Sequence, residues 1–190
     1  MAVREILQVG DPILRQRSVK ITHFDGALSR LVDDMVETMH AANGVGLAAP
    51  QVGVSRRVIV VEMPSDAHMG DDREFPHPGE RFVLCNPKIV KASRETEIAQ
   101  EGCLSVAGYV GEVERSVQVI VNGQNLQGRQ ARIKADGFLA RAFQHEIDHL
   151  DGILYVDIAE EGSIVSLEEL RQAAQEQQAN GEQKEMPAVI

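Results

Sequence analysis

The sequence predicts an α+β fold in which antiparallel or mixed β-sheets pack around one central helix. Apolar residues at positions 28 to 39 recur every three or four residues, which is the spacing of an amphipathic helix. β-Branched runs at residues 58–62, 82–90 and 117–121 indicate strands. A second helix, predicted over residues 137–150, is apolar on most of its faces, so we expect it to be buried.

Turn-forming residues set the expected boundaries of these elements. The Asn-Gly pair at 43–44 should end the first helix, and residues 63–79, which lack any period, should form a loop or insertion. The Asn-Gly pair at 122–123 predicts a hairpin turn. We expect Asp136 to cap the second helix and Gly152 to end it.

Composition separates a folded domain at residues 1–162 from an acidic tail at residues 163–190. The tail should begin with a helix over residues 166–179, in which Ser166 is the cap and Glu169 completes a capping box. Beyond that helix, the low hydrophobicity of the chain predicts disorder.

Charge and cysteine content argue against several classes of protein. A net charge of -10 and a pI of about 5.1 are not those of a nucleic-acid binder that relies on a basic surface. Two cysteines in 190 residues are too few for a secreted disulfide framework. The sequence shows no signal-peptide core and no apolar run of membrane-spanning length. We therefore expect a soluble, cytoplasmic protein that binds neither nucleic acid nor membranes.

The predicted central helix carries the pattern His145-Glu146-Ile147-Asp148-His149. Histidines four residues apart lie one turn apart on one helix face, where two imidazoles can bind the same metal ion. Glu146 then lies beside the ion without being needed as a ligand. The plainer interpretation is a chance pattern on a solvated helix. Unpartnered imidazoles and carboxylates are costly to bury in such apolar surroundings, however, and a metal removes that cost.

Two histidines leave a tetrahedral metal short of one protein ligand and one open position. The residues alone offer two candidates for the third ligand. Glu169 lies twenty residues after His149, which is the spacing of the glutamate ligand in thermolysin-like peptidases. Cys103, within Glu-Gly-Cys-Leu-Ser, is the other candidate, although a lone cysteine is more often a small buried apolar residue.

Three segments resemble the signature motifs of the peptide deformylase family, in the same order and at similar spacing. They are Gly-Val-Gly-Leu-Ala-Ala-Pro-Gln at 44–51, Glu-Gly-Cys-Leu-Ser at 101–105 and Gln-His-Glu-Ile-Asp-His-Leu at 144–150. The resemblance covers about residues 3–157 and implies the family's fold, with antiparallel sheets around a central metal-binding helix. It also implies that Cys103 is the third metal ligand, beside His145 and His149.

The resemblance further implies a cofactor and the roles of other residues. Family members bind one divalent metal per chain, typically Fe²⁺, and Zn²⁺, Ni²⁺ or Co²⁺ can occupy the site. Glu146 would act first as general base and then as general acid. The side-chain amide of Gln51 and the backbone N–H of Leu104 would hold the oxyanion of the tetrahedral intermediate.

The implied function makes residues 1–162 a metal-hydrolase catalytic domain that removes the N-formyl group from the formyl-methionine of nascent polypeptides and releases formate. The formyl-methionyl peptide would lie as an added strand against Val45, Gly46 and Gly102, because glycine allows the close approach of another backbone. The ribosome is a further candidate partner. The acidic tail nevertheless differs from the basic C-terminal helix by which some family members dock on it.

Two other functions fit the same metal-binding helix. A thermolysin-like endopeptidase would use Glu169 as its third ligand, and a binding module with a structural metal would have no turnover. Glu146 argues against the binding module, because a carboxylate that lies beside a metal without ligating it meets no structural need.

A chain truncated after Gly162 should still fold, bind metal and deformylate, because all three motif segments end by Leu150. Some loss of stability is compatible with this prediction, because Leu167 and Leu170 of the tail can pack on the domain. The measurements are metal content and formate release, on the truncated chain and on full-length Glu169→Ala. An empty metal site in both proteins would favour the peptidase, since the loss of a ligand empties a site.

Overall fold

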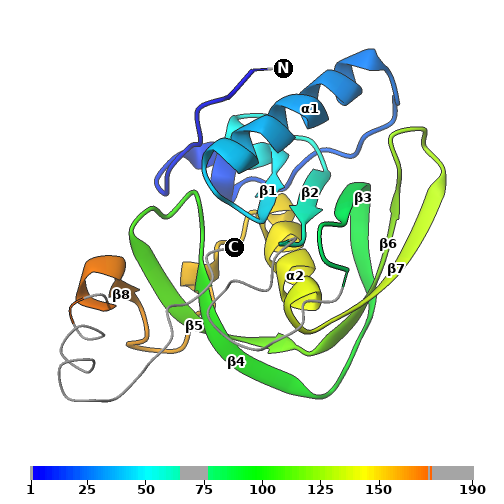
Figure 1. Ribbon diagram of the computed structural model, residues 1–190. Helices are drawn as coiled ribbons and strands as arrows, with labels where there is room; N and C mark the ends of the chain where they lie inside the picture. The colour runs from blue at the N-terminus through cyan, green and yellow to red at the C-terminus, as the bar shows by residue number, and fades with distance from the viewer. Residues whose placement is uncertain (1, 65–76, 171, 173–190) are drawn as a thin grey trace.

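In the computed structural model, which describes residues 2–64, 77–170 and 172, two antiparallel sheets surround one helix (Figure 1). The helices are α1 (Gly26–Ala41) and α2 (Gly137–Asp151), with the short 3₁₀ helices η1 (Pro12–Arg15), η2 (Ala49–Val52) and η3 (Tyr155–Asp157). The larger sheet has the order β1 (Gly46–Ala48), β2 (Val58–Glu62), β3 (Arg81–Ala92), β6 (Gln118–Gln124) and β7 (Gln130–Asp136). The smaller sheet has the order β4 (Thr96–Gly102), β5 (Tyr109–Ser116) and β8 (Val165–Ser166).

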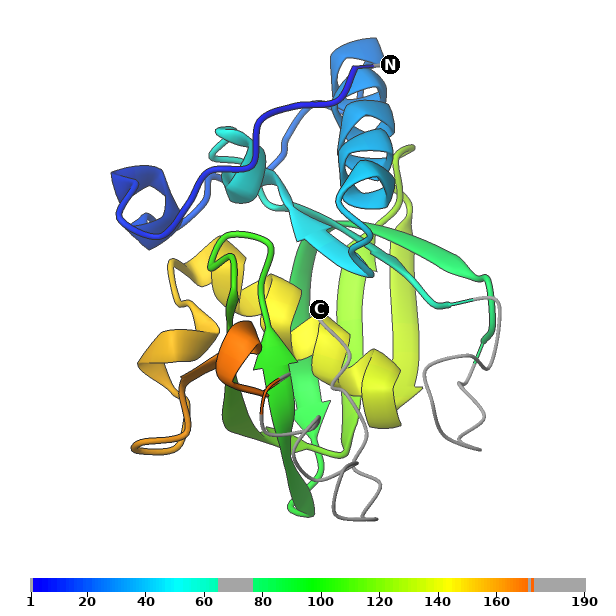
Figure 2. The same cartoon turned by 60° about the vertical axis from the view of Figure 1, so that its left-hand side comes forward.

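Helix α2 is the centre of the fold, and eleven of its fifteen residues are buried. Figure 1 shows α2 enclosed by the strands of both sheets, and Figure 2 shows α1 lying outside β1 and β2. The predicted α+β fold, with antiparallel sheets around a central helix, is therefore confirmed. None of the helices in the described part of the chain combines the length and the apolar character that a bilayer span requires.

Strand β2 separates two apolar cores, because the side chains of a strand point alternately to its two faces. Val58 and Val60 belong to the core beneath α1, whereas Ile59 and Val61 belong to the core around α2, together with Phe143. All five side chains are fully buried. A strand that is covered on both faces has a continuous run of apolar residues in its sequence. This is why the sequence predicted β2 correctly.

The first helix lies where the sequence predicts it. The carboxylate of Asp25 accepts the N–H groups of Ala27 and Leu28 at 2.9 and 3.0 Å, which caps the start of α1. The helix ends at Ala41, and the positive φ of Asn43 (+53°) turns the chain at the predicted Asn-Gly pair. Most of the loop or insertion expected at residues 63–79 lies outside the described residues.

The hairpin turn predicted at Asn122 and Gly123 is wrong. Both residues lie inside β6, and the chain turns at residues 125–129 instead. The carboxamide oxygen of Asn125 accepts two backbone N–H groups of that turn, at 3.0 and 2.9 Å. Gly123 instead lies in close contact with the neighbouring strand. A Cβ there would lie 3.2 Å from the carbonyl oxygen of Cys85 on the neighbouring strand.

Strands β4, β5 and β7 do not appear in the sequence-based prediction. Strand β5 shows why, because one of its faces exposes Glu112 and Glu114 while the other buries Val113 and Arg115. An inward-facing arginine breaks the alternation of apolar and polar residues that marks a half-buried strand.

Helix α2 continues directly from β7. Asp136 occupies the N-cap position, as predicted, but its side chain makes no capping hydrogen bond. Instead the Gly137 N–H donates to the Val117 carbonyl at 3.0 Å. Gly152 ends the helix in the left-handed conformation (φ +80°), as predicted. A Cβ on Gly152 would lie 2.6 Å from the carbonyl oxygen of Arg15, so the end of α2 packs directly on η1.

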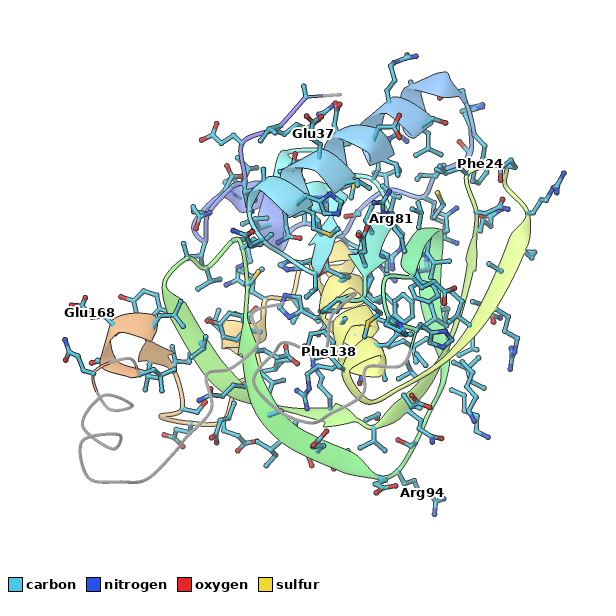
Figure 3. The ribbon with its side chains drawn as sticks, in the orientation of Figure 1. Phe24, Glu37, Arg81, Arg94, Phe138 and Glu168 are labelled. Carbon is cyan, nitrogen blue, oxygen red and sulfur yellow. The ribbon has the colours of Figure 1, made fainter. Side chains whose placement is uncertain are left out.

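The tail begins in contact with the smaller sheet, where β8 pairs with β5. The predicted capping box is present: Glu169 accepts the Ser166 N–H at 2.8 Å, and the Ser166 hydroxyl accepts the Glu169 N–H at 3.1 Å. The neighbouring Glu168 side chain points away from the fold (Figure 3). The remainder of the predicted helix and the predicted disordered end lie outside the described residues. The domain boundary at residue 162 stays a prediction.

Replacement of Gly152 by alanine should lower the free energy of unfolding by more than the same change at Gly162. Both residues have positive φ, +80° and +76°. Each alanine therefore costs about 1–2 kcal/mol in the left-handed conformation. The methyl at 152 also meets the Arg15 carbonyl, whereas a Cβ at 162 meets nothing within 4 Å. Urea unfolding measures the difference. Equal losses would contradict the packing of α2 on η1.

Candidate metal centre

Three buried side chains with metal-ligating atoms converge where α2 faces the smaller sheet. Cys103 directly follows β4, and His145 and His149 lie one turn apart on α2. Their ligand atoms all lie within 4.8 Å of one another, and the Cys103 Sγ is 3.2 Å from the Nε2 of His149. Each of the three side chains is at most 3% exposed. The structure therefore brings together the three residues that the sequence resemblance implies as ligands.

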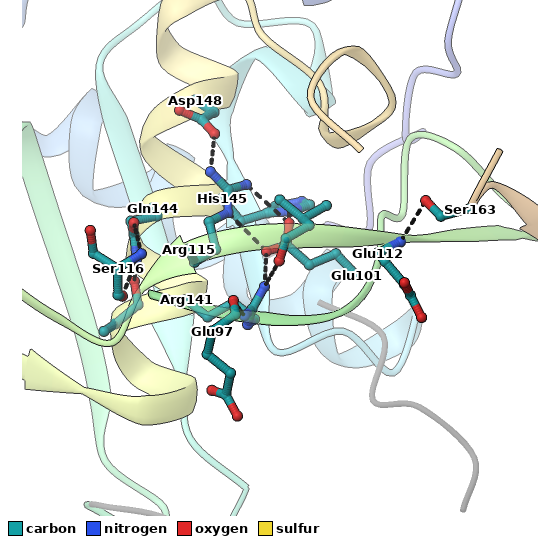
Figure 4. A network of polar contacts seen from close by, with 12 residues as sticks. Glu97, Glu101, Glu112, Arg115, Ser116, Arg141, Gln144, His145, Asp148 and Ser163 are labelled. Carbon is teal, nitrogen blue, oxygen red and sulfur yellow. Dashed lines mark hydrogen bonds and ion pairs between the residues drawn. The ribbon is translucent and has the colours of Figure 1, made fainter. Parts of the chain in front are cut away.

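The orientation of His145 depends on the fully buried carboxylate of Glu101. The Glu101 Oε2 lies 3.0 Å from the His145 Nδ1, which leaves the other ring nitrogen, Nε2, for a metal. Arg115 donates to the same carboxylate at 2.9 and 3.0 Å, and Arg141 donates to it at 2.9 Å (Figure 4). Burial opposes ionisation of Glu101. Hydrogen bonds from His145 and Arg115 outweigh that burial and lower the pKa of the carboxyl to about 2.

The two arginines also connect α2 with the smaller sheet. Arg141 donates to the carbonyl oxygens of Val113 at 2.8 Å and Glu97 at 2.7 Å, so this α2 side chain is bonded to β5 and β4. Arg115 reaches in the opposite direction, from β5 to Asp148 on α2. These contacts hold the strand that delivers Cys103 against the helix that carries both histidines.

The donor atoms fit a divalent metal ion. The Nε2 of His145 is buried and has no hydrogen-bond partner among the described residues. Burial, with a smaller contribution from His145, lowers the pKa of His149 well below its usual value, and neutral imidazole is the form that binds metals. Burial raises the pKa of the Cys103 thiol to about 12. A bound cation would stabilise the thiolate, and a thiolate with two imidazoles suits first-row divalent metals.

Glu146 lies beside this cluster, and its side chain is 1% exposed. Its Oε2 has no hydrogen-bond partner within the described part of the chain. Burial, reinforced by the charges of Glu101 and Asp148, raises the pKa of Glu146 well above its usual value. The backbone of Gly46 lies directly against the carboxylate, because a Cβ at 46 would be 2.2 Å from the Glu146 Oε1. Only glycine leaves room for Glu146 in this place.

The side-chain amide of Gln51 is oriented by contacts at both of its ends. Its Oε1 accepts the Ala48 N–H at 2.7 Å, and its Nε2 donates to the Cys103 Sγ at 3.6 Å and the Ser105 Oγ at 3.2 Å. The amide thus caps its own loop through oxygen and presents its N–H groups to the cluster.

The segments that contain the predicted substrate-binding residues lie side by side. A Cβ on Gly44 would be 2.7 Å from the Cδ1 of Leu104, so the chain that leads to Val45 and Gly46 runs next to the turn after Gly102. No acceptor among the described residues takes the Leu104 N–H. This leaves that donor available beside the Gln51 amide.

The structure separates the two candidates for the third ligand. Glu169 is exposed and bonded to Ser166 in the tail, outside the cluster that contains Cys103. Sequence reasoning missed the roles of Glu101 and Arg115. The sequence gives one indication for Glu101, which lies two residues before the cysteine in the second motif. It gives no indication for Arg115, because only the pairing of β4 with β5 brings this arginine to the site.

Comparisons with known proteins agree with this geometry. A sequence model of the polypeptide deformylase family matches residues 3–163. The peptide deformylase of Thermomicrobium roseum is 49% identical over 164 residues, covering 86% of this chain and 89% of that protein. The solved peptide deformylase of Thermotoga maritima has a TM-score of 0.74 at 39% identity and covers 84% of this chain and 99% of its own. The class I type b enzyme of Acinetobacter baumannii was solved with bound Met-Ala-Ser. It has a TM-score of 0.76 at 38% identity, and the match covers 83% of this chain and 98% of that enzyme. By sequence and by structure, this chain belongs to the peptide deformylase family.

Proposed function

We propose that this chain is a metal-dependent amide hydrolase that removes the N-formyl group from the formyl-methionine of nascent polypeptides and releases formate. Membership of the family supports the reaction, and one observation of the structure supports the mechanism. Glu146 is a buried carboxylate that lies beside three metal-ligating side chains and has no partner of its own within the described residues. A group in this position can move a proton between water and a substrate.

The proposed ligands are Cys103, His145 and His149, with one divalent ion per chain. When bound, such an ion acts as a Lewis acid, making water a nucleophile near neutral pH and polarising the substrate carbonyl. The single sulfur donor among the three favours borderline ions over Mg²⁺ or Ca²⁺. We propose Fe²⁺ as the native metal, as in the family, with Zn²⁺, Ni²⁺ and Co²⁺ as ions that the same donors accept.

Glu146 carries the proton transfers in this proposal. Its ionised carboxylate takes a proton from the attacking water at Oε2, as a new C–O bond forms at the formyl carbon. The protonated carboxyl then delivers that proton to the departing amine nitrogen, as the C–N bond breaks and formate is released. A raised pKa suits both steps, because it makes the carboxylate a stronger base and keeps its acid form accessible.

The oxyanion that develops on the formyl oxygen needs donors that are already in place. The Nε2 of Gln51 and the backbone N–H of Leu104 are proposed for this role, because both lie beside Cys103 and the Gln51 amide is held at its oxygen by Ala48. The peptide itself is proposed to lie along Val45, Gly46 and Gly102 as an added strand, where main-chain hydrogen bonds accept any sequence.

Features of two relatives are consistent with a peptide substrate. The Acinetobacter baumannii relative was solved with Met-Ala-Ser bound, and the Synechococcus elongatus relative was solved with actinonin. We propose that the chain acts in the cytoplasm on formylated nascent chains. Docking on the ribosome would require a surface other than a basic C-terminal helix, because residues 163–190 are acidic.

Formate release from a formyl-Met-Ala peptide, with the unformylated peptide as control, tests this function. The metal-loaded wild type should release formate, and Glu146→Ala should keep its metal and lose at least the about 10²–10⁴-fold that general acid–base catalysis supplies. Near wild-type turnover by the metal-loaded variant would disprove the assigned role of Glu146. Cleavage of the unformylated peptide would favour an endopeptidase.

Cys103→Ala should abolish tight metal binding, whereas Cys85→Ala should leave the metal content unchanged. Both cysteines are free and buried, so each variant removes one buried sulfur, but only Cys103 lies among other metal-ligating groups. Cys85 lies in the core beneath α1, where its loss should cost about 1 kcal/mol of stability. Metal analysis and urea unfolding of both variants provide the comparison. Equal metal loss, or no loss in either variant, would rule out Cys103 as the third ligand.

A further inference from the structure

The N-terminal strap, which we define as residues 6–9, joins two parts of the site. The Leu7 N–H donates to the Gln51 carbonyl at 2.8 Å, and the Val9 N–H donates to the Ser105 carbonyl at 2.7 Å. Figure 2 shows the blue N-terminal chain passing the cyan η2 segment on its way to η1. The strap therefore links η2, which carries Gln51, to the turn after β4, which carries Leu104. The Gln51 amide and the Leu104 N–H are the oxyanion donors of the proposed function, and this inference rests on that function.

Gln8, within the strap, bonds to this turn through both ends of its carboxamide. Its Nε2 donates to the Leu104 carbonyl at 3.0 Å, and its Oε1 accepts the Ala107 N–H at 3.2 Å. The Nε2 also lies 3.2 Å from the Ile6 carbonyl, within the strap itself. The side chain is exposed, so it fills no part of an apolar core. Its contribution to the structure is thus the set of polar contacts that it makes with the turn.

The bond to the Leu104 carbonyl has a consequence for the metal ligand. In a trans peptide the C=O and the following N–H point in opposite directions. Because the Leu104 carbonyl points toward Gln8, the Ser105 N–H points back into the site, where it donates to the Cys103 Sγ at 3.4 Å. The Cys103 carbonyl accepts the Val106 N–H at 2.9 Å, which closes the turn that carries the Leu104 N–H.

We propose that Gln8 is a positioning residue for deformylation. By holding the peptide between Leu104 and Ser105, it aims the Ser105 N–H at the sulfur of Cys103. This peptide directly follows the Leu104 N–H, so holding it also restrains the turn, closed by the bond from the Val106 N–H to the Cys103 carbonyl, that presents the Leu104 N–H to the developing oxyanion. Such donors act well only when their direction is set before the charge develops. Gln8 acts entirely through the turn after β4, which it bonds at Leu104 and at Ala107.

The strap is anchored independently of the Gln8 side chain. The Arg4 N–H donates to the Thr38 Oγ1 at 2.9 Å, and the Arg4 guanidinium pairs with Asp34 on α1 at 2.8 Å. On the other side of the strap, the Asp11 N–H donates to the backbone carbonyl of Gln8 at 3.1 Å. Substitution of the exposed Gln8 side chain should therefore leave the strap and the fold in place.

Three substitutions separate the donor of Gln8 from its acceptor. Gln8→Ala removes both, and Gln8→Glu keeps an acceptor for Ala107 but places a carboxylate before the Leu104 carbonyl. Gln8→Lys keeps a donor for that carbonyl. Gln127→Ala is the matched control, because this glutamine is also exposed but lies in the turn between β6 and β7.

The first measurement is the steady-state hydrolysis of a formyl-methionyl peptide by the metal-loaded, full-length proteins. We expect kcat to fall in Gln8→Ala and Gln8→Glu by about 3- to 30-fold, less than the about 10²–10³-fold lost when an oxyanion donor is removed outright. KM, metal content and thermal stability should stay unchanged. Gln8→Lys and Gln127→Ala should retain the wild-type kcat. An unchanged kcat in Gln8→Ala, or a rise in KM alone, would overturn the proposal.

The second measurement requires no turnover. In the Zn²⁺-loaded protein, the amide ¹H–¹⁵N signals of Leu104 and Ser105 should move in Gln8→Ala and Gln8→Glu but not in Gln127→Ala. Signals that do not move would overturn the proposal even if kcat falls. A wild type that releases no formate would refute the proposed function instead, and the amide signals would then decide whether Gln8 orients the turn.

Discussion

The Glu101 carboxylate is fully buried, and the geometry of the metal centre depends on how its charge is neutralised. An isolated buried charge is so unfavourable that it must be paired, and removal of one partner from a buried pair typically costs about 3–5 kcal/mol. Arg115 from β5 and Arg141 from α2 supply the pairing. Satisfying this one carboxylate therefore forces the smaller sheet against the central helix. The Glu101 Oε2 also contacts the Nδ1 of His145 and orients that ring. The Glu101 carboxylate therefore determines both the charge balance of the core and the direction of a proposed ligand.

The apolar enclosure of α2 has a chemical consequence as well as a structural one. Water is excluded from the side chains of Glu146 and His149, which burial holds toward their neutral forms. A neutral imidazole is ready to bind a metal, and a carboxyl with a raised pKa is suited to exchanging protons near neutrality. The close approach of Gly46 keeps the Glu146 carboxylate in one place. The packing that stabilises the helix thus also prepares its polar residues for the proposed reaction.

Segments far apart in the sequence complete the site through hydrogen bonds. The turn after β4 is bonded on one side to the N-terminal strap and on the other to the amide of Gln51. Neither contact involves a large apolar side chain, and the Gln8 side chain is exposed. Hydrogen bonds of this kind fix direction more than they add stability, because each replaces a bond to water and contributes only about 0.5–1.5 kcal/mol. Here they align the Gln51 amide and the N–H groups of the turn after β4.

Local sequence patterns determined the two helices, their ends near Gly44 and Gly152, strand β2, the capping box of the tail and the pair of histidines on α2. Each of these depends on residues within a few positions of one another, where periodicity and turn chemistry apply directly. The residues alone left Cys103 and Glu169 as rival third ligands, and the resemblance to a family was needed to choose between them. Only the tertiary structure revealed the partners of Glu101, the turn at residues 125–129 and the strap across the site. The reason is physical: the partner of a buried charge or of a free backbone group is set by which strands pair in space, and nothing in the neighbouring residues records that pairing.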